Sequence, residues 1–244
     1  MDFLFGSPLS DPDKWLDCFV DTKFSGRRYK GIYSGPLGIS LYAYPNLGTH
    51  CHLEIKGEAI DAIGQLRVFE FLEALNYLKA PPEDGQAERK AARWSVRRID
   101  IALDHMPFTP RQCYDALSRG DMRCSASRKS FKWFSNSEGD TLYIGSRASG
   151  RLIRIYNRRG FTRLEIESKG NWAELVGSRC ASDGCGDFES FAISYVRQFL
   201  DFVDSSTGGS VTRADLLPWW LEFVGNIDRA GLKPKDREFV SSAV

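Results

Sequence analysis

In one stretch of the chain, every second residue is a branched aliphatic residue. Residues 98–104 read Arg-Ile-Asp-Ile-Ala-Leu-Asp, so aliphatic residues with branched side chains take every second position. Alternate residues of a β-strand share a face, and these aliphatic residues therefore lie together on one side. The other side carries Asp100 and Asp104. A pattern of this period predicts a strand with one face in a core and one polar face, as in antiparallel sheets.

The same alternation recurs in residues 163–167, Arg-Leu-Glu-Ile-Glu, which carry Glu165 and Glu167 on their polar face. Other short stretches are rich in aromatic or β-branched residues and are bounded by turn residues, so they also predict strands. The predicted strands are 29–33, 38–44, 50–56, 96–104, 129–135, 141–145, 151–157 and 162–168.

Other stretches predict helices. Residues 65–79 repeat their apolar residues at helical spacing, and Thr109 before Pro110 is typical of an N-cap followed by the first helical position. The predicted helices are 65–79, 110–117, 187–202 and 214–224. Strands joined mostly by tight turns, with helices between some of them, predict an α+β fold, a largely antiparallel β-sheet covered by helices.

The end of the chain differs in composition from the rest. Residues 205–210, Ser-Ser-Thr-Gly-Gly-Ser, are typical of a flexible joint. We therefore expect one main domain over residues 1–203, followed by this joint and a helical tail over residues 204–244. Trp219 and Trp220 are adjacent in the tail, and we expect them to be buried because neighbouring tryptophans in an apolar helix usually pack in a core.

The charge of the chain is balanced overall but not locally. It has 33 Lys and Arg against 32 Asp and Glu, and a formal net charge of +1 gives no support to a nucleic-acid partner. Residues 147–163, however, carry six arginines and no acid, so a local positive face is compatible with a neutral whole. No apolar run is long enough to span a bilayer, and the N-terminus lacks a signal-peptide pattern, so we expect a soluble cytoplasmic protein.

The acids of the two alternating strands are candidates for a metal site. If these strands are neighbours, four carboxylates converge on one patch, and like charges at close range repel unless a cation binds them. The four are Asp100, Asp104, Glu165 and Glu167. Oxygen ligands of this kind suit Mg²⁺ or Mn²⁺. The alternative is an ordinary solvated face on which Arg98 and Arg163 pair with the acids.

Tyr156 lies on a third predicted strand, on the same face as Arg154. A tyrosine on a strand usually serves packing. Phosphodiester cleavage by a tyrosine, however, needs an oxygen that attacks phosphorus and a cation or arginines that absorb the developing charge. Both kinds of group lie within a short stretch of chain, which favours Tyr156 as a nucleophile. Tyr143 is the nearest competitor for this role.

A short histidine pattern also offers metal ligands. His50 and His52 are separated by one residue, so both rings would face the same way on a strand, as in the metal sites of many tyrosine nickases. Two ordinary surface histidines are the alternative that we favour, because a three-residue pattern often occurs by chance.

Three segments resemble, in the same order, motif strands of the trans-acting replication initiators of rolling-circle plasmids. This family also includes initiators of some filamentous phages and relaxases of some conjugative elements. The segments are Arg98–Asp104, Thr141–Arg158 and Arg163–Glu167, and the middle one is long and specific. The likeness spans about residues 96–178 and implies a rolling-circle nickase-like fold. The link at residues 157–162 is shorter than in plasmid members of the family.

The resemblance also implies roles for single residues. The nucleophilic tyrosine of the family falls on Tyr156. Its metal-site carboxylates fall on Asp100, Asp104 and Glu165, with Glu167 as a further candidate, and the implied cofactor is Mg²⁺ or Mn²⁺. Arg147 and Arg154 match basic positions of the family. From their positive charge we expect Arg147, Arg151, Arg154 and Arg158 to contact DNA.

The implied function is that of a rolling-circle replication initiator, which nicks and rejoins origin DNA through a covalent 5′-phosphotyrosine intermediate. The implied partners are single-stranded or hairpin origin DNA, a host helicase and a second copy of the chain, with no membrane. Three alternatives stay open. They are a conjugative or mobilisation relaxase with the same chemistry, a non-catalytic origin-binding protein, and a carboxylate-metal nuclease that forms no protein adduct.

Overall fold

The computed structural model of the chain describes residues 19–26, 28–35, 38–46, 50–77, 95–125, 131–182, 187–207 and 211–233. The chain divides into two compact units, Met1–Ala91 and Ala92–Val244, and each contains a sheet of its own. The division predicted from the sequence, a main domain over residues 1–203 and a tail over residues 204–244, stays a prediction.

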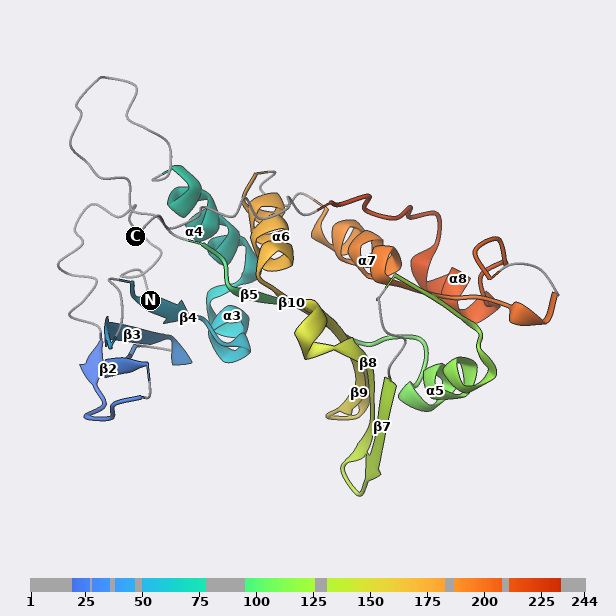
Figure 1. The fold of residues 1–244 in the computed structure, drawn as a ribbon, viewed down its shortest axis with the longest axis horizontal. Coiled ribbons are helices and arrows are strands. Elements are labelled where there is room, and N and C mark those ends of the chain that lie inside the picture. The colour runs from blue at the N-terminus through green and yellow to red at the C-terminus, as the bar shows by residue number, and fades with distance from the viewer. Residues whose placement is uncertain are drawn as a thin grey trace, which may run out of the picture. The chain divides into compact units, whose positions relative to one another are not determined.

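The unit Met1–Ala91 contains a four-stranded antiparallel sheet of order β1-β2-β3-β4 (Figure 1). Its strands are β1 (Val20–Asp21), β2 (Tyr29–Ser34), β3 (Ser40–Pro45) and β4 (His52–Glu54). Its described helices are α3 (Gly57–Ile63) and α4 (Gln65–Tyr77). Three predicted strands are thus confirmed, although β4 is shorter than the predicted residues 50–56. The helix predicted at residues 65–79 is confirmed as far as Tyr77, and its last two residues lie outside the described residues. β1 and α3 are additions to the predicted elements.

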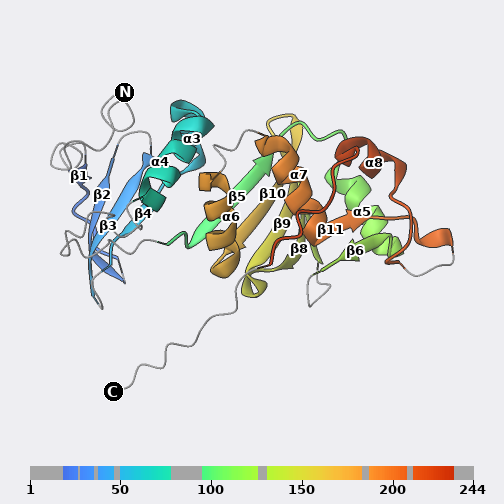
Figure 2. The ribbon, with the colours of Figure 1, turned by 90° about the horizontal axis from the view of Figure 1, so that it is seen from above.

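The unit Ala92–Val244 is built on a five-stranded sheet of order β5-β10-β9-β8-β7 (Figure 2). Its strands are β5 (Arg98–Leu103), β7 (Phe131–Asn136), β8 (Gly139–Ser146), β9 (Arg151–Arg158) and β10 (Phe161–Lys169). Each lies where the sequence predicts a strand. Every neighbouring pair in this sheet is antiparallel, and helices lie against it, so the predicted α+β fold is confirmed.

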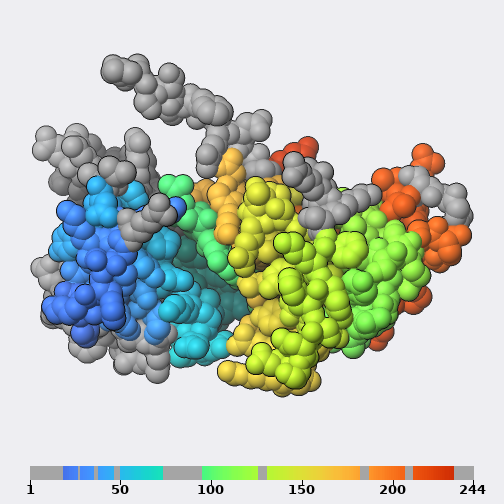
Figure 3. Space-filling model, turned by 60° about the horizontal axis from the view of Figure 1, so that its bottom comes forward, coloured from blue at the N-terminus to red at the C-terminus, as the bar shows by residue number. Residues whose placement is uncertain are grey.

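Three helices pack on one face of this sheet (Figure 2). They are α5 (Pro110–Arg119), α6 (Asn171–Ser182) and α7 (Phe188–Phe199). The strand residues buried beneath them include Ile101, Leu142, Ile153, Ile155, Leu164 and Ile166. Removing a side chain of this size from water contributes about 1.5–3 kcal/mol, so this layer is a major source of stability. The opposite face of β7, β8 and β9 is open, and Figure 3 shows it in yellow-green.

The helix α5 begins and ends at the residues that the sequence indicates. The Thr109 side chain accepts a hydrogen bond from the backbone N–H of Gln112 at 3.1 Å, and Pro110 occupies the first helical turn. Gly120 ends the helix in a left-handed conformation with φ of 84°, which glycine adopts without strain. The predicted N-cap is therefore confirmed.

The helix predicted over residues 187–202 ends early. α7 stops at Phe199, and the next three residues form β11 (Leu200–Phe202), which pairs antiparallel with β6 (Met122–Cys124). All three residues of β11 are buried. Their backbone groups are satisfied by the pairing with β6, so this tertiary contact overrides the local preference for a helix. The prediction was wrong for these three residues.

The helix α8 (Pro218–Val224) packs its tryptophans into the core of the same unit. Trp220 is fully buried, and its ring centroid lies 5.1 Å from that of Phe202 and 5.6 Å from that of Phe108. Trp219 is half-buried against the same two phenylalanines. The predicted burial is therefore complete for Trp220 and partial for Trp219. In the described parts of the chain, no helix is long and apolar enough to cross a membrane.

Asp201 of β11 is fully buried and is held by three arginines. Arg123, Arg197 and Arg229 place nitrogens 3.0, 3.1 and 2.8 Å from its carboxylate oxygens, and Trp220 Nε1 donates a hydrogen bond at 3.0 Å. Burial raises the pKa of Asp201, but these hydrogen bonds outweigh it and hold the pKa below its ordinary value. The ionised carboxylate thus joins β6, α7 and the C-terminal segment at one point.

The turn between β9 and β10 fixes how these two strands align. Arg158 pairs with Phe161, so only two residues form the loop. Both have positive φ, 47° at Arg159 and 89° at Gly160, and such two-residue turns match the twist of paired strands. The hairpin therefore sets the register of the strand that carries Tyr156.

Candidate functional site

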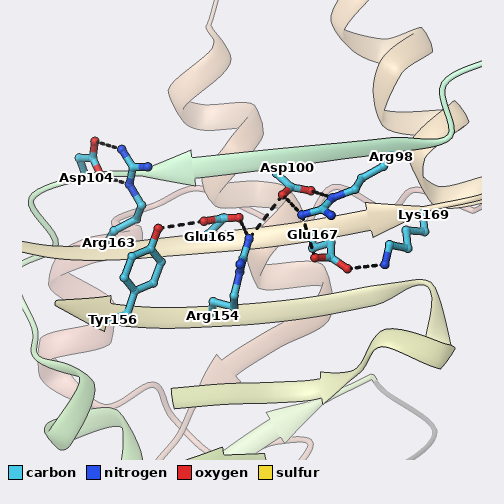
Figure 4. Close-up of polar contacts among 9 residues, drawn as sticks. All are labelled: Arg98, Asp100, Asp104, Arg154, Tyr156, Arg163, Glu165, Glu167 and Lys169. Atoms are coloured by element: carbon cyan, nitrogen blue, oxygen red, sulfur yellow. Dashed lines mark hydrogen bonds and ion pairs between the residues drawn. The ribbon is translucent and has the colours of Figure 1, made fainter. Parts of the chain in front are cut away.

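The three strands that carry the predicted site residues are neighbours in the sheet, since β10 lies between β9 and β5. Tyr156 on β9 is directly opposite Arg163 on β10, and Glu167 on β10 is opposite Asp100. Directly opposed residues of antiparallel strands share a face. The acids, the arginines beside them and Tyr156 therefore gather on the face away from the helices (Figure 4).

Tyr156 is half-buried, and its hydroxyl donates a hydrogen bond to Glu165 Oε2 at 3.1 Å. Glu165 is only 7% exposed, and its other oxygen accepts a hydrogen bond from Arg154. A carboxylate in this position orients the hydroxyl group and is placed to accept its proton. The contact between Tyr156 and Glu165 thus places a hydroxyl group and a carboxylate within hydrogen-bonding distance on adjacent strands.

Arg154 stands between two of the acids. The same Arg154 nitrogen that contacts Glu165 lies 3.4 Å from Asp100 Oδ2. Asp100 also accepts a hydrogen bond from Arg98 at 2.8 Å. These contacts balance the negative charge of both carboxylates by means of arginine side chains.

Glu167 lies next to this group and is almost fully buried, with 1% of its surface exposed. Its oxygens lie 3.0 Å from Arg98 and 2.8 Å from Lys169. A buried carboxylate is costly unless a cation is close, and these two side chains provide that charge. The two cations offset the charge of Glu167, but among the described residues neither of its buried oxygens accepts a hydrogen bond.

At the other end of the site, Arg163 and Asp104 form a two-pronged ion pair, in which Arg163 Nη2 lies 2.6 Å from Asp104 Oδ2. The hydrogen bond from Arg163 lowers the pKa of Asp104, and the positive charge of Arg158 nearby lowers it further. The pKa of Arg163 is raised by the same hydrogen bond, with a smaller contribution from Tyr156.

The ion pair between Arg163 and Asp104 leads to a prediction about the titration of Asp104. In the variant Arg163→Gln, the pKa of Asp104 is expected to rise toward its ordinary value of 3.8, because the strongest lowering contact is lost. A carboxyl whose pKa is lowered by folding stabilises the folded state above its unfolded pKa, and this contribution is lost as the pH falls through the folded pKa. Carboxyl ¹³C chemical shifts of Asp104, followed between pH 6 and pH 2, measure the change.

Arg111→Gln is the matched control for this titration, since Arg111 pairs with Asp115 on the exposed side of α5. It removes the same charge from the unit and is expected to leave the Asp104 titration unchanged. Equal titration of Asp104 in the wild type and in Arg163→Gln would contradict the proposed cause.

The four acids do not form a metal site in this arrangement. Among the described residues, no three histidine, cysteine or acidic side chains lie close enough together to hold an ion. Asp100 and Asp104 are four residues apart on one extended segment, or about 13 Å, so one ion cannot easily bind both. The observed contacts correspond to the alternative stated from the sequence, in which Arg98 and Arg163 form ion pairs with the acids.

The predicted DNA-contacting arginines lie in different places. Arg154 and Arg158 are on the open face beside Tyr156, and Arg147 is exposed in a short 3₁₀ helix, η2 (Arg147–Ser149). Arg151 lies on the other face, only 8% exposed, with its guanidinium 3.7 Å from the centre of the Trp172 ring. Because this stacked side chain is covered by helices, it cannot reach DNA on the open face.

Two other candidates are also placed by the structure. His50 and His52 belong to the unit Met1–Ala91, where their rings contact those of Tyr29 and Tyr42. Tyr143 on β8 lies opposite Arg154 and shares the open face with Tyr156. Of the two tyrosines, the described hydrogen bond to a site carboxylate belongs to Tyr156.

The role of Arg154 as a bridge between acids is a feature that the sequence analysis missed. The signal was present in the two-residue turn, because a hairpin closed by Arg158 and Phe161 places Arg154 opposite Glu165. Lys169, which contacts Glu167, was also missed. It continues the same alternation by one step beyond residues 163–167, so the strand pattern could have indicated it.

Two comparisons with known proteins found similarity to this chain. Residues 94–242 match the sequence profile of the family described as replication initiation factor. The fold is similar to that of the rolling circle replication initiator protein from Geobacillus stearothermophilus, with a TM-score of 0.66 and 18% identity over 90% of this chain and 89% of that one. No curated protein sequence matches the chain. Because the family profile covers more than half of its length and includes all of the acid and tyrosine strands, the chain belongs to the replication initiation factor family.

Proposed function

We propose that the protein initiates rolling-circle replication by nicking and rejoining origin DNA, with Tyr156 as the nucleophile. The observation that carries the proposal is the hydrogen bond from the Tyr156 hydroxyl to Glu165 on the open face of the sheet. Family membership supports DNA as the substrate. The similar solved structure, which is that of a rolling circle replication initiator, supports the type of replication.

The chemistry follows from the neighbours of the tyrosine. The Tyr156 oxygen attacks the scissile phosphorus and its proton passes to Glu165, the carboxylate that accepts its hydrogen bond. The new bond joins Tyr156 to the 5′ phosphate, while the bond to the 3′ oxygen breaks. The 3′ oxygen takes up a proton from water, and Glu165 afterwards releases its proton to water. The free 3′ hydroxyl primes synthesis. Rejoining is the reverse reaction, in which a 3′ hydroxyl attacks the phosphotyrosine.

Arginines on the same face would absorb the negative charge that develops on the phosphate. Arg154 and Arg163 lie on either side of the Tyr156–Glu165 contact, and each already binds a carboxylate. Both offer further N–H groups, because a guanidinium carries five donors. Arg158, two residues after Tyr156 on β9, and the exposed Arg147 in η2 would hold the DNA backbone.

The divalent ion stays a prediction, with Asp100, Asp104 and Glu165 as its predicted ligands. Carboxylate oxygens suit Mg²⁺ or Mn²⁺ in chemistry, but their present arrangement, paired with arginines, does not fit one ion. An ion at Asp100 and Glu165 would have to compete with Arg154 for the same oxygens. The helicase partner and the second copy of the chain also stay predictions.

The test is a cleavage assay on labelled single-stranded hairpins from the DNA that carries the gene. With a label at the 3′ end, the labelled fragment is expected to stay attached to the protein in detergent. With a label at the 5′ end, a free fragment is expected whose 3′ hydroxyl a polymerase can extend. Parallel reactions with EDTA, Mg²⁺ and Mn²⁺ test the predicted ion.

Other results of this assay would favour other functions. Cleavage that leaves a free 5′ phosphate, with no protein attached to either fragment, would indicate a nuclease without a tyrosine intermediate. Tight hairpin binding without any cleavage in the presence of either ion would indicate an origin-binding protein. Either result would overturn the proposal.

A further inference from the structure

The edge of the open face carries aromatic side chains that the cleavage chemistry does not use. β7 and β8 form a hairpin at the end of the five-stranded sheet, in which Lys132 is opposite Tyr143 and Phe134 is opposite Thr141. Thr141 is in turn opposite Tyr156 on β9. Phe134 and Tyr143 therefore face the same side as Tyr156. Two strand spacings separate Phe134 from Tyr156, a distance of about 10 Å.

Phe134 is unusually accessible for a phenylalanine on a strand, with 54% of its surface exposed. Its ring meets that of Tyr143 nearly at a right angle, with centroids 5.7 Å apart. In such an edge-to-face pair one ring makes contact only through its edge, so its own faces are not used by the partner. This arrangement leaves an aromatic face available for stacking.

Phe131 on the same strand is also exposed, at 40%, but it differs from Phe134 in the side of the sheet on which it lies. It points to the opposite, helix-covered side, because it is an odd number of residues away, and its ring packs against that of Tyr114 on α5 with centroids 6.0 Å apart. Phe131 thus has an internal partner that accounts for it. The Phe134 ring, in contrast, pairs with the ring of Tyr143 on the open face.

The charges around these aromatic residues suit a nucleic-acid strand. Lys132 is exposed and lies opposite Tyr143, and Arg154 lies opposite Tyr143 on the other side. The acids of the site are already paired with arginines, so they present little net repulsion to a phosphate backbone. Aromatic rings next to cations are the usual arrangement that binds single strands, because every base has a face that can stack.

We propose that Phe134 and Tyr143 form a base-stacking subsite for unpaired nucleotides next to the scissile phosphate, with Lys132 on the backbone. This inference rests on the proposed function. Phosphates repeat at 3.4 Å or more along a strand, so a base on Phe134 is within about three nucleotides of the phosphate at Tyr156. The subsite selects single-stranded DNA, since bases in a duplex have no free face.

The test measures the binding of a fluorescent mixed-sequence single-stranded 20-mer and of the matching duplex, with the full chain carrying Tyr156→Phe so that no cleavage occurs. Phe134→Ala is expected to weaken single-strand binding about tenfold and to leave duplex binding unchanged. Phe134→Trp, which keeps an aromatic face, is expected to bind as tightly as Phe134. A 2-aminopurine base in the 20-mer is expected to lose fluorescence on binding, and less so with Phe134→Ala.

Phe131→Ala is the matched control, since it removes the same side chain from the same strand but from the other face. It is expected to bind the 20-mer normally, and thermal unfolding of each variant verifies its fold. Unchanged single-strand binding in Phe134→Ala, or an equal loss for single strand and duplex, would overturn the subsite. Because this assay needs no cleavage, it can succeed even if Tyr156 is not the nucleophile, and the adduct assay can succeed even if the subsite fails.

Discussion

With Tyr156 replaced by phenylalanine, the protein is expected to bind its hairpin substrate but to form no covalent adduct. The phenyl ring keeps the packing of the strand and removes only the hydroxyl that contacts Glu165. Without the attacking oxygen there is no phosphotyrosine, so adduct formation should fall by a factor on the order of 10⁴ or more. The rate at which a 3′-labelled hairpin becomes attached to protein in detergent gives this factor, and anisotropy gives the affinity.

Tyr114→Phe is the control for this variant. Tyr114 is on α5, where its ring packs against Trp133 on the helix-covered side of the sheet, and it has no contact with the site acids among those described. It should form the adduct at the wild-type rate. If the Tyr156→Phe variant still became linked to DNA, another residue would be the nucleophile, and Tyr143 would be the first to examine because it shares the face.

The second large effect is on stability and concerns Asp201. In Asp201→Ala, the side chains of Arg123 and Arg197 keep their charge at positions that are only 20% and 12% exposed, but lose the carboxylate that balances them. Removing one partner of a buried ion pair costs about 3–5 kcal/mol, because the remaining charge is buried without compensation. For a unit of this size, that corresponds to a fall in melting temperature on the order of 10 °C. Thermal unfolding followed by circular dichroism measures it.

An exposed ion pair provides the comparison for this loss. Asp115 pairs with Arg111 across one turn of α5, and both side chains are largely in solvent. Asp115→Ala is expected to change the free energy of unfolding by less than about 0.5 kcal/mol, as is usual for surface pairs. Losses of similar size in Asp115→Ala and Asp201→Ala would mean that the Asp201 cluster does not stabilise the unit.

The sheet was the most predictable part of the structure. The strands β5, β9 and β10 follow from the alternation of aliphatic and polar residues, which decides both their extent and which side of each enters the core. Arg151 could have been predicted in the same way. Arg151 is an odd number of residues from Arg154 and Arg158, so the strand alternation places its side chain on the core side. The prediction of DNA contacts considered only the charge of the three arginines and therefore did not separate Arg151 from the other two.

Other parts depend on contacts that a local pattern does not contain. β11 exists because Leu200–Phe202 meet β6, some eighty residues earlier in the chain, and nothing in residues 187–202 alone distinguishes this end from more helix. The helix α6 contains Gly177, where an added Cβ would lie 2.6 Å from the Val96 side chain. Its glycine weakens the helical signal but is required by this close approach.

The acid patch shows the same limit at the level of side chains. The alternating strands place the carboxylates on one face, but whether a metal or arginines neutralise them depends on how neighbouring strands align. The alignment brings Arg154 opposite Glu165 and Arg163 opposite Tyr156. Family resemblance is the source of the role proposed for Tyr156, which strand propensity alone would assign to packing.

The short turn after Tyr156 has a consequence for how such a protein can diversify. One residue added in β9 before Tyr156 would reverse the faces of the strand residues that follow and point Tyr156 at the helices, and one added at the start of β10 would do the same to Glu165. Residues added between Arg159 and Gly160, in contrast, would extend outward from the sheet and leave both ladders in place. This turn is therefore the position at which a new segment can be inserted close to Tyr156 while the pairing of β9 and β10 is kept.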